Sequence, residues 1–274
     1  MNQREKAEAF RQLHAGPRAL MLPNIWDVVS ARIVERAGFP AIATSSAAIA
    51  WTLGVPDGER ISREEMAAVV TRIARSVAVP VTADMEAGYG PRPEDAAATA
   101  RAVVAAGAVG MNLEDASDAD GELLGVTLQA ERIRAAQEAA AAVGVPIVIN
   151  ARTDVFLARI GEPAGRLSHA VRRLNAYREA GAGCLFAPGV KDAATIGVLA
   201  REVAGPLNIL VGPGAPSVPE LERLGVRRVS LGAGVMRAAL GVVRRVATEL
   251  CGLGTYAAIA ETSLMDDINR LLGG

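Results

Sequence analysis

The stretch "VPVTADMEAGYGPRPEDAAATARAVVAAGAVGMNLED", residues 79–115, holds one complete repeat of the pattern that decides the fold. A short β-rich run ends in acidic residues, an Ala- and Arg-rich helical pattern follows, and a second β-rich run again ends in acids. Pro93, Glu94 and Asp95 mark the first turn of the helix, where a proline and negative charges are favourable. This alternation is typical of a parallel sheet joined by helical crossovers.

The same unit occurs eight times along the 274 residues. Each of the following β-rich runs precedes a helical segment of ordinary length: "ALMLPN", "AIATSS", "VPVTADM", "VGMNLED", "PIVINART", "GCLFAPG", "LNILVG" and "RRVSLGA". Capping boxes are expected at two helix starts and left-handed glycines at four helix ends, namely Ser62 with Glu65, Ser217 with Glu220, Gly38, Gly107, Gly144 and Gly181. With no linker or composition break, the sequence predicts an α/β fold, a single (β/α)8 TIM-type barrel domain over residues 1–274.

Helical patterns also extend beyond the barrel at both ends. Residues 3–13 form an amphipathic pattern that predicts a helix closing the bottom of the barrel. Helical regions at 234–250 and around 255–272 follow the last strand and exceed what one barrel needs. We therefore expect the tail of about 234–274 to pack on a partner subunit.

Composition excludes several classes of function. The formal net charge is −1 and basic residues are spread along the chain, so no nucleic-acid partner is expected. No apolar run approaches the roughly 20 residues of a membrane span, and the N-terminus lacks the pattern of a signal peptide, which predicts a cytoplasmic protein. Two distant cysteines indicate neither a disulfide framework nor a thiolate zinc site. The histidines, His14 and His169, lie away from strand ends, so they cannot build a three-histidine zinc site.

Alternation along the predicted strands sorts inward from outward side chains. Val81 and Ala83 are apolar and face the helices, so Asp84 faces the barrel interior, as does Glu86 if the extended geometry continues that far. The same sorting directs Glu114 and Arg152 inward from the next two strands. These side chains then meet at the carboxyl end of the barrel, where such enzymes keep their active sites.

Three converging carboxylates, those of Asp84, Glu86 and Glu114, would repel one another unless a cation neutralised them. Carboxylate oxygens favour Mg²⁺ or Mn²⁺ over zinc. A single acid at a strand end is often only solvated or caps the next helix, but agreement among several strands favours a metal site. Asp115 has the outward parity, which predicts a structural role for it.

The sequence resembles the isocitrate lyase/phosphoenolpyruvate mutase superfamily over essentially the whole barrel. The motifs that carry the resemblance are "SS" at 45–46, "TLGVPD" at 52–57, "DMEAGYG" at 84–90, "NLED" at 112–115 and "NARTD" at 150–154. The resemblance implies a magnesium ion bound directly by Asp84, with Glu86 and Glu114 acting through waters. It further implies homo-oligomers, dimers or more usually tetramers, in which the last helix packs on a neighbour.

The resemblance also assigns roles around the substrate. It implies that a substrate carboxylate is held by Ser45 and by the backbone near Ser46 and Ala47. Arg152 would hold the same carboxylate or the developing enolate, and Asp57 would border the reacting centre. Gly212, after the seventh strand, is expected to shape the pocket wall through its backbone. Glutamate at 86 departs from many relatives, which have aspartate there.

Chemistry and one departure narrow the expected reaction. A 2-oxo acid can chelate the cation, and a metal with an arginine stabilises the enolate formed when the bond beyond C3 breaks. The superfamily's carbon-carbon lyases carry a Lys-Lys-Cys-Gly-His segment after the fourth strand. Here residues 116–133 read "ASDADGELLGVTLQAERI", with none of cysteine, histidine, lysine or the asparagine of the mutases.

We therefore expect a Mg²⁺-dependent lyase for a small 2-oxo or 2-hydroxy dicarboxylate, like an oxaloacetate decarboxylase or a weak methylisocitrate or isocitrate lyase. Phosphonopyruvate hydrolysis or carbon-phosphorus mutase activity is an alternative, and so is a non-catalytic protein that binds a 2-oxo acid. Two further rivals are a Schiff-base aldolase using Lys191 and a phosphate site at "GAG", residues 232–234. A solvated loop is the favoured reading of Lys191, with Asp192 capping the next helix.

Overall fold

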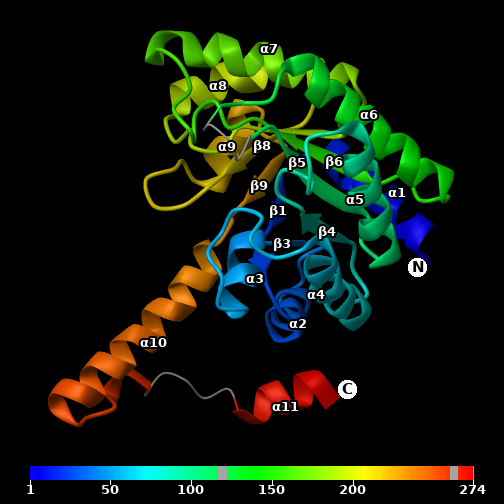
Figure 1. Cartoon of the computed structure of the whole chain (residues 1–274). Helices are drawn as coiled ribbons and strands as arrows, with labels where there is room; N and C mark the ends of the chain where they lie inside the picture. Colours follow the sequence, from blue (N-terminus) through cyan, green and yellow to red (C-terminus); the bar gives the residue numbers. More distant parts are fainter. Residues whose placement is uncertain (117–121, 260–264, 274) are drawn as a thin grey trace.

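The computed structural model describes residues 1–116, 122–259 and 265–273. Its centre is a sheet of parallel strand segments surrounded by helices (Figure 1). The strand segments are β1 (Leu20–Leu22), β2 (Asn24–Ile25), β3 (Ile42–Thr44), β4 (Val81–Asp84), β5 (Gly110–Glu114), β6 (Val148–Arg152), β7 (Cys184–Phe186), β8 (Leu207–Leu210) and β9 (Arg228–Ser230).

The helices alternate with these strands in the chain. They are α1 (Gln3–Ala15), α2 (Val28–Arg36), α3 (Ser46–Thr52), α4 (Arg63–Ser76), α5 (Pro93–Ala105), α6 (Val126–Ala142), α7 (Arg166–Glu179), α8 (Ala193–Glu202), α9 (Val218–Leu224), α10 (Gly234–Leu253) and α11 (Met265–Gly273). Short 3-10 turns, η1 (Pro163–Gly165) and η2 (Ala257–Ile259), precede α7 and follow α10.

The nine segments correspond to the eight predicted strands because the first strand is broken at Pro23. β1 pairs with β9 on one side, where Leu22 lies opposite Ser230, and β2 pairs with β3 on the other. Pro23 has no N–H to donate to a neighbouring strand, so it interrupts the hydrogen-bonded pairing. The first strand changes its partner from β9 to β3 at this residue. The first strand thereby nearly closes the barrel, and the predicted TIM-type fold is confirmed.

The predicted helix signals are also confirmed. Reciprocal capping boxes join Ser62 to Glu65 and Ser217 to Glu220, and Pro93 begins α5. Each of the four glycines expected at helix ends comes directly after the C-cap residue of a helix. The φ values of these glycines are positive, between 84° and 104°, at Gly38, Gly107, Gly144 and Gly181. Local sequence therefore determines where these helices begin and end.

Helix α1 closes the amino end of the barrel, as the sequence predicted. Phe10 of α1 lies so close to Gly110, at the start of β5, that a Cβ there would come within 2.7 Å of its ring. The fully buried Arg228 lies 6.0 Å from the centre of the same ring and 3.5 Å from His14 Nε2. Burial and the charge of Arg228 lower the pKa of His14 to about 3, so this histidine is neutral.

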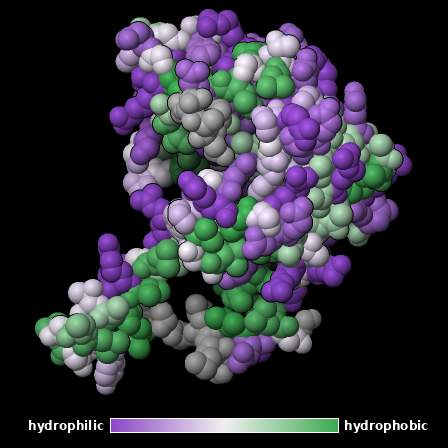
Figure 2. All heavy atoms as spheres, viewed as in Figure 1, coloured by the Kyte–Doolittle hydropathy of each residue, from purple (hydrophilic) through white to green (hydrophobic). Residues whose placement is uncertain are grey.

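The C-terminal tail leaves the barrel along α10, which projects away from it in Figure 1. Figure 2 shows hydrophobic surface along the projecting helix. The exposed apolar residues of α10 include Leu240, Val243, Leu250 and Leu253. Helix α11 then contacts α2, where Arg32 Nη2 donates to the Leu271 carbonyl at 2.8 Å. The predicted helix at 255–272 corresponds to η2 and α11, while residues 260–264 lie outside the described residues. None of the described helices is long and apolar enough to cross a membrane.

Candidate active site

The predicted acids and arginine lie at the carboxyl ends of three neighbouring strands. Asp84 is the last residue of β4, Glu114 of β5 and Arg152 of β6, and Glu114 lies directly opposite Arg152 in the ladder. Contacts across the interior confirm the predicted parity. Asn112 Nδ2 donates to Asp84 Oδ1 at 2.9 Å, and Asn150 Nδ2 donates to Asn112 Oδ1 at 2.7 Å. Adjacent strands therefore deliver these side chains to one place.

Asp84 is held by donors that are all neutral. Its Oδ2 accepts from the backbone N–H and the hydroxyl of Ser46, at 3.0 and 2.9 Å, and its Oδ1 accepts from Asn112. The Asp84 N–H donates to Thr44 Oγ1 at 2.8 Å, which fixes the end of the strand. The carboxylate is therefore oriented without being neutralised.

The segment predicted to hold a substrate carboxylate borders Asp84. Ser45 is buried and caps α3 by accepting from the Ala48 N–H at 3.4 Å. Both donors of Ser46 are directed to Asp84, and Ala47 is half-buried in the first turn of α3. The structure thus brings Ser45, Ser46 and Ala47 beside the acid.

Glu86 reaches the site by a route that the sequence argument did not foresee. The strand ends at Asp84, and Glu86 has a left-handed backbone with φ of 51°, so the condition of extended geometry through residue 86 is not met. The turn nevertheless buries its carboxylate, which is 5% exposed. Oε2 accepts from the Glu59 N–H at 2.5 Å, while the buried Oε1 has no hydrogen-bond partner among the described residues.

Negative charge accumulates around this turn. Burial, together with the charges of Asp84 and Asp57, raises the pKa of Glu86 to about 7. Burial and the charge of Asp84 also raise the pKa of Asp57, which lies in the exposed loop after α3. The turn therefore favours any additional positive charge that can approach the acids.

Arg152 is the cation of the site, and two carboxylates engage it. Its Nη1 lies 2.5 Å from Glu114 Oε2, while Nε and Nη2 bind the two oxygens of Asp154 at 2.6 and 2.7 Å. Burial alone would lower the pKa of the Arg152 guanidinium, but the charges of Glu114 and Asp154 outweigh it and raise the pKa. Nε and Nη2 thus hydrogen-bond to Asp154, whereas Nη1 forms an ion pair with Glu114 that lacks hydrogen-bond geometry. The other N–H groups of Nη1 and Nη2 are the ones that can face a substrate.

The ion pair changes the expected charge balance. Because Glu114 is paired with Arg152, the predicted repulsion among three carboxylates is relieved in part without a metal. Asp84 and Glu86 accept hydrogen bonds from neutral groups alone and carry the remaining uncompensated charge.

Asp115 has the structural role that its outward parity predicted. It is fully buried, and its carboxylate accepts from Arg173 Nε at 2.7 Å, from the Tyr177 hydroxyl at 2.6 Å and from the Asp154 N–H at 3.0 Å. Asp115 therefore anchors the segment after β6 and, through Asp154, the orientation of Arg152.

A matching family model now adds to this geometry. The model for phosphoenolpyruvate phosphomutase matches residues 10–251, which is most of the chain. The chain belongs to this family. The resemblance to the isocitrate lyase/phosphoenolpyruvate mutase superfamily, inferred from the strand-end motifs, is thereby confirmed.

Curated relatives of the phosphoenolpyruvate phosphomutase family align over most of the chain. A 2-methylisocitrate lyase from Halalkalibacterium halodurans is 31% identical over 209 residues, which cover 75% of this chain and 67% of the relative. An oxaloacetate decarboxylase from Rhodopseudomonas palustris is 29% identical over 284 residues, covering 97% of this chain and 93% of the relative.

Solved structures share the complete fold. A provisionally named lyase/mutase from Burkholderia cenocepacia is 40% identical, with a TM-score of 0.93 and coverage of 99% of this chain and 97% of that one. A 2,3-dimethylmalate lyase of the superfamily is 27% identical, with a TM-score of 0.84 and coverage of 98% and 95%. The relatives are thus lyases and mutases, and the chain belongs among enzymes.

The donor set fits a hard divalent cation bound through few direct ligands. Among the described residues, no three side chains of Asp, Glu, His or Cys lie close enough together to enclose a metal ion. Mg²⁺ commonly keeps several waters and binds one or two carboxylates directly. Asp84, the unpartnered Oε1 of Glu86 and the nearby Glu114 offer that arrangement.

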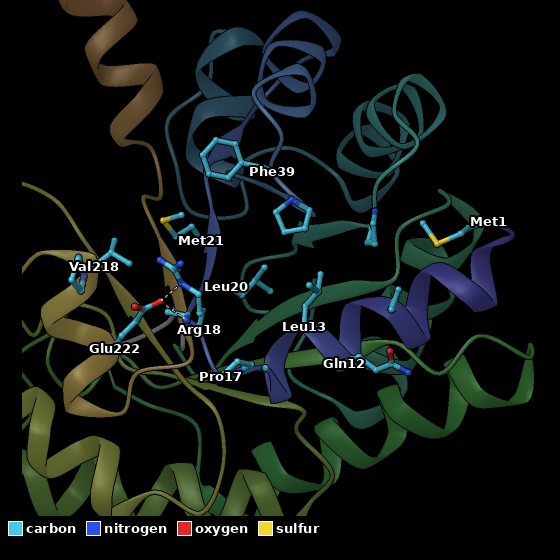
Figure 3. Close-up of a pocket in the computed structure, with 16 residues that line it drawn as sticks. Met1, Gln12, Leu13, Pro17, Arg18, Leu20, Met21, Phe39, Val218 and Glu222 are labelled. Atoms are coloured by element: carbon cyan, nitrogen blue, oxygen red, sulfur yellow. Dashed lines mark hydrogen bonds and ion pairs between the residues drawn. The ribbon is translucent and has the colours of Figure 1, made fainter.

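A large cavity of about 950 Å³ lies at the opposite, amino end of the barrel (Figure 3). Leu13 of α1, Met21 of β1, Phe39 and Val218 line it, and its ion pair joins Arg18 to Glu222 at 3.6 Å. The predicted acids are absent from its lining. Its position at the amino end separates it from the candidate active site.

Not every predicted site residue contacts the acids. Gly212 lies exposed in the loop after β8, with open space where a side chain would be. Sequence reasoning missed Asn112 and Asp154 as site residues, although Asn112 has the inward parity and Asp154 shares the parity of Arg152. It also missed Glu59, for which the sequence carries no comparable signal.

Proposed function

We propose that this chain is a divalent-metal-dependent lyase that cleaves a carbon-carbon bond of a small 2-oxo or 2-hydroxy dicarboxylate, with oxaloacetate decarboxylation as the leading reaction. The observation that carries the proposal is the juxtaposition of two carboxylates that accept only from neutral donors of the described residues, Asp84 and Glu86, with the buried guanidinium of Arg152. The names of the relatives support it, since they include an oxaloacetate decarboxylase and two carbon-carbon lyases.

Asp84 would bind Mg²⁺ or Mn²⁺ directly, and Glu86 and Glu114 would bind its waters. When bound, the cation acts as a Lewis acid that polarises a substrate carbonyl oxygen. The chain's part is to hold these carboxylates in place: Ser46 and Asn112 fix both oxygens of Asp84, while Arg152 fixes Glu114.

Arg152 would stabilise the negative charge that develops when the bond beyond C3 breaks. The N–H groups that Asp154 does not engage can donate to the substrate carboxylate or to the enolate oxygen, and such hydrogen bonds strengthen as that oxygen gains charge. Ser45 and the backbone near Ala47 would orient the substrate carboxylate, while both donors of Ser46 hold Asp84. Asp57 would border the reacting carbon, and the backbone of Gly212 would form part of the pocket wall.

Protonation of the enolate would come from solvent. Residues 116–133 supply none of the cysteine, histidine or lysine found in the superfamily's mobile segment, although residues 117–121 lie outside the described part of the chain. Decarboxylation or retro-Claisen cleavage makes the smallest demand on a protein acid at this point.

The family match favours a second candidate, in which the same site acts on a carbon-phosphorus bond as a phosphonopyruvate hydrolase or mutase. A third candidate, of a different functional class, is that this chain binds 2-oxo acids without turning them over. Lys191, the rival Schiff-base residue, is exposed, and Asp192 caps α8 by accepting from the Thr195 N–H at 2.8 Å.

We expect protein stripped of metal by a chelator to be inactive and Mg²⁺ or Mn²⁺ to restore turnover of one substrate. The screen covers oxaloacetate, methylisocitrate, isocitrate, dimethylmalate and phosphonopyruvate, with product release as the measurement. Turnover of phosphonopyruvate alone would establish the second candidate, and binding of 2-oxo acids with no turnover would establish the non-catalytic one. Metal-independent turnover, or a borohydride-trapped pyruvate adduct on Lys191, contradicts the metal mechanism.

Glu86 provides a prediction about pH. Its pKa is raised from the ordinary 4.5 to about 7, so the folded protein holds a proton that the unfolded chain releases more readily. This stabilisation is complete below about pH 4.5 and is lost as the pH rises through about 7, a change on the order of 2–3 kcal/mol. In metal-free protein at about pH 8, Glu86→Gln should therefore raise Tm by roughly 4–8 °C relative to wild type.

The same comparison at about pH 5 should show little difference, because the wild-type carboxyl is then protonated. Thermal unfolding with a chelator at both pH values checks this. An identical Tm difference at the two pH values would show that the burial of Glu86 has another basis. The variant should also bind Mn²⁺ more weakly, since an amide is a poorer partner for the cation's waters.

We also propose that the tail of about 234–274 packs on a partner subunit and makes the protein a homo-oligomer. The exposed apolar residues of α10 support this arrangement. Light scattering should give a dimeric or tetrameric mass, and Leu240→Glu combined with Val243→Glu should reduce it. A monomeric mass for the wild-type protein at micromolar concentration would contradict the proposal.

A further inference from the structure

Resting on the proposed function, we infer that Arg132 is a positioning residue for the metal-site acids Glu86 and Glu114. Arg132 is part of α6 and is fully buried. It lies outside the set of side chains assigned to the metal or the substrate. Its guanidinium instead joins the two segments of backbone that carry these acids.

The segment after Glu86 has an unfavourable backbone conformation. Of residues 86–90, all but Ala87 have positive φ values, including the non-glycine residues Glu86 at 51° and Tyr89 at 60°. Left-handed geometry is unfavourable for an L-residue, because its Cβ comes too close to the following carbonyl oxygen. Such a turn persists only where its surroundings determine it, so the contacts that hold this turn also set the place of the Glu86 carboxylate.

Arg132 supplies contacts of that kind. Its Nη2 donates to the carbonyls of Ala87 and Gly90, the latter at 3.1 Å, and these carbonyls lie on either side of Gly88. Its Nη1 donates to the Glu114 carbonyl at 3.5 Å and to Gln129 Oε1 at 2.5 Å. One guanidinium therefore connects the turn after Glu86 to the last residue of β5.

The turn is packed directly against this guanidinium. A Cβ at Gly88 would lie 3.1 Å from Arg132 Nη2 and 2.7 Å from Leu113 Cδ1. The φ of Gly88 is +91°, so both the conformation and the space require glycine. The Gly-Tyr-Gly sequence after the acid pair thus fits the turn to Arg132.

The chemistry of these contacts favours positioning over simple space filling. All four acceptors are neutral oxygens, and desolvating a guanidinium is costly unless its hydrogen bonds are strong. An apolar side chain could fill the same volume at lower cost, but it would remove the donors of the Ala87 and Gly90 carbonyls. Arg132 is therefore suited to fixing backbone carbonyls in a turn of unfavourable geometry.

The two acids are also linked to each other through backbone. The Glu114 N–H donates to the Glu86 carbonyl at 3.0 Å, so a shift of the turn moves both acids relative to Asp84. Contacts through water depend on the separation of the carboxylates. Loss of partners that orient metal-site groups typically costs 10- to 100-fold in metal affinity.

The test compares Arg132→Lys with Arg228→Lys, using Mn²⁺ binding measured by electron paramagnetic resonance. Lysine keeps the charge, but its single nitrogen cannot replace the planar fork in which Nη1 and Nη2 reach separate acceptors. Arg228 is a matched control, because it is equally buried but lies at the amino end of the barrel beside His14. We expect Arg132→Lys to weaken Mn²⁺ binding by about 10- to 100-fold and Arg228→Lys to leave it within about twofold.

Gln129→Met gives the test a milder variant that retains Arg132. Gln129 accepts from Arg132 and donates to the Leu113 carbonyl at 3.3 Å, so its loss should weaken Mn²⁺ binding in the same direction by less. In kinetics, the metal concentration for half-maximal rate should rise in both variants while kcat at saturating metal changes little. A purely structural role would lower Tm without this split.

The outcomes separate the two proposals. If Arg132→Lys and Gln129→Met bind Mn²⁺ as wild type does, with only Tm lowered, the inference is overturned and the proposed function stands. If both variants fail to fold while Arg228→Lys folds, the role of Arg132 is structural and the inference is again overturned. If wild-type protein itself binds no Mn²⁺, the proposed function fails first and the inference falls with it.

Discussion

Asp84→Ala is expected to lower kcat/KM with Mg²⁺ by at least about three orders of magnitude, or about 4 kcal/mol of transition-state stabilisation. Asp84 lies at the end of a strand, and both of its oxygens are fixed by neutral donors, from Ser46 and Asn112. It is therefore oriented but uncompensated, as a direct ligand of a cation should be. Steady-state kinetics over a range of Mg²⁺ concentrations measure the effect.

Asp192→Ala is the matched control for this variant. Asp192 caps α8 at the surface, so its loss should cost about 1 kcal/mol of stability with no change in turnover. If Asp84→Ala keeps a tenth or more of wild-type kcat/KM while remaining folded, Asp84 does not have the proposed role.

Arg152→Lys is expected to lower kcat by about 10²- to 10³-fold with a smaller change in KM. A lysine retains the positive charge, but its single nitrogen cannot bind both oxygens of Asp154, pair with Glu114 and still donate to a substrate. The loss should therefore fall mainly on the step in which charge develops. Single-turnover kinetics at saturating substrate isolate that step from binding.

The stability of Arg152→Lys must be measured beside its kinetics, since Glu114 and Asp154 become less well paired. Arg228→Lys, at the other end of the barrel, shows what the loss of a buried guanidinium does to Tm alone. An Arg152→Lys enzyme with wild-type kcat would assign the residue to structure instead of catalysis.

The fold could be predicted from the sequence because its signals are local and repeated. Strand alternation, the capping boxes at Ser62 and Ser217, and the positive-φ glycines all depend on near neighbours in the chain. Parity then placed Asp84, Glu114 and Arg152 at one end of the barrel, because a regular strand keeps its alternation to its last residue.

Strand parity gives no guide to side-chain direction beyond the last residue of a regular strand. The inward placement of Glu86 by parity required extended geometry beyond Asp84, and the structure has a left-handed turn there. The glycines at 88 and 90 were a sign that the strand stops there. Glu59 and Arg132 reach this turn from distant parts of the chain, and no local pattern indicates such contacts.

The ion pair between Glu114 and Arg152 could not be predicted from the sequence either. Parity showed that Glu114 and Arg152 face the same interior, but their direct opposition in the β5–β6 ladder depends on the register of the two strands. That register pairs them at 2.5 Å and leaves Asp84 and Glu86 as the acids without a charged partner. The prediction of a cation site therefore depends mainly on Asp84 and Glu86, and less on Glu114.

The most direct test of the central claim, that Asp84 holds a divalent cation, is Mn²⁺ binding to chelator-treated protein followed by electron paramagnetic resonance. We predict one Mn²⁺ site per chain in the wild-type protein and loss of that site in a folded Asp84→Ala variant. Equal binding by the two proteins, or none by the wild type, would contradict it.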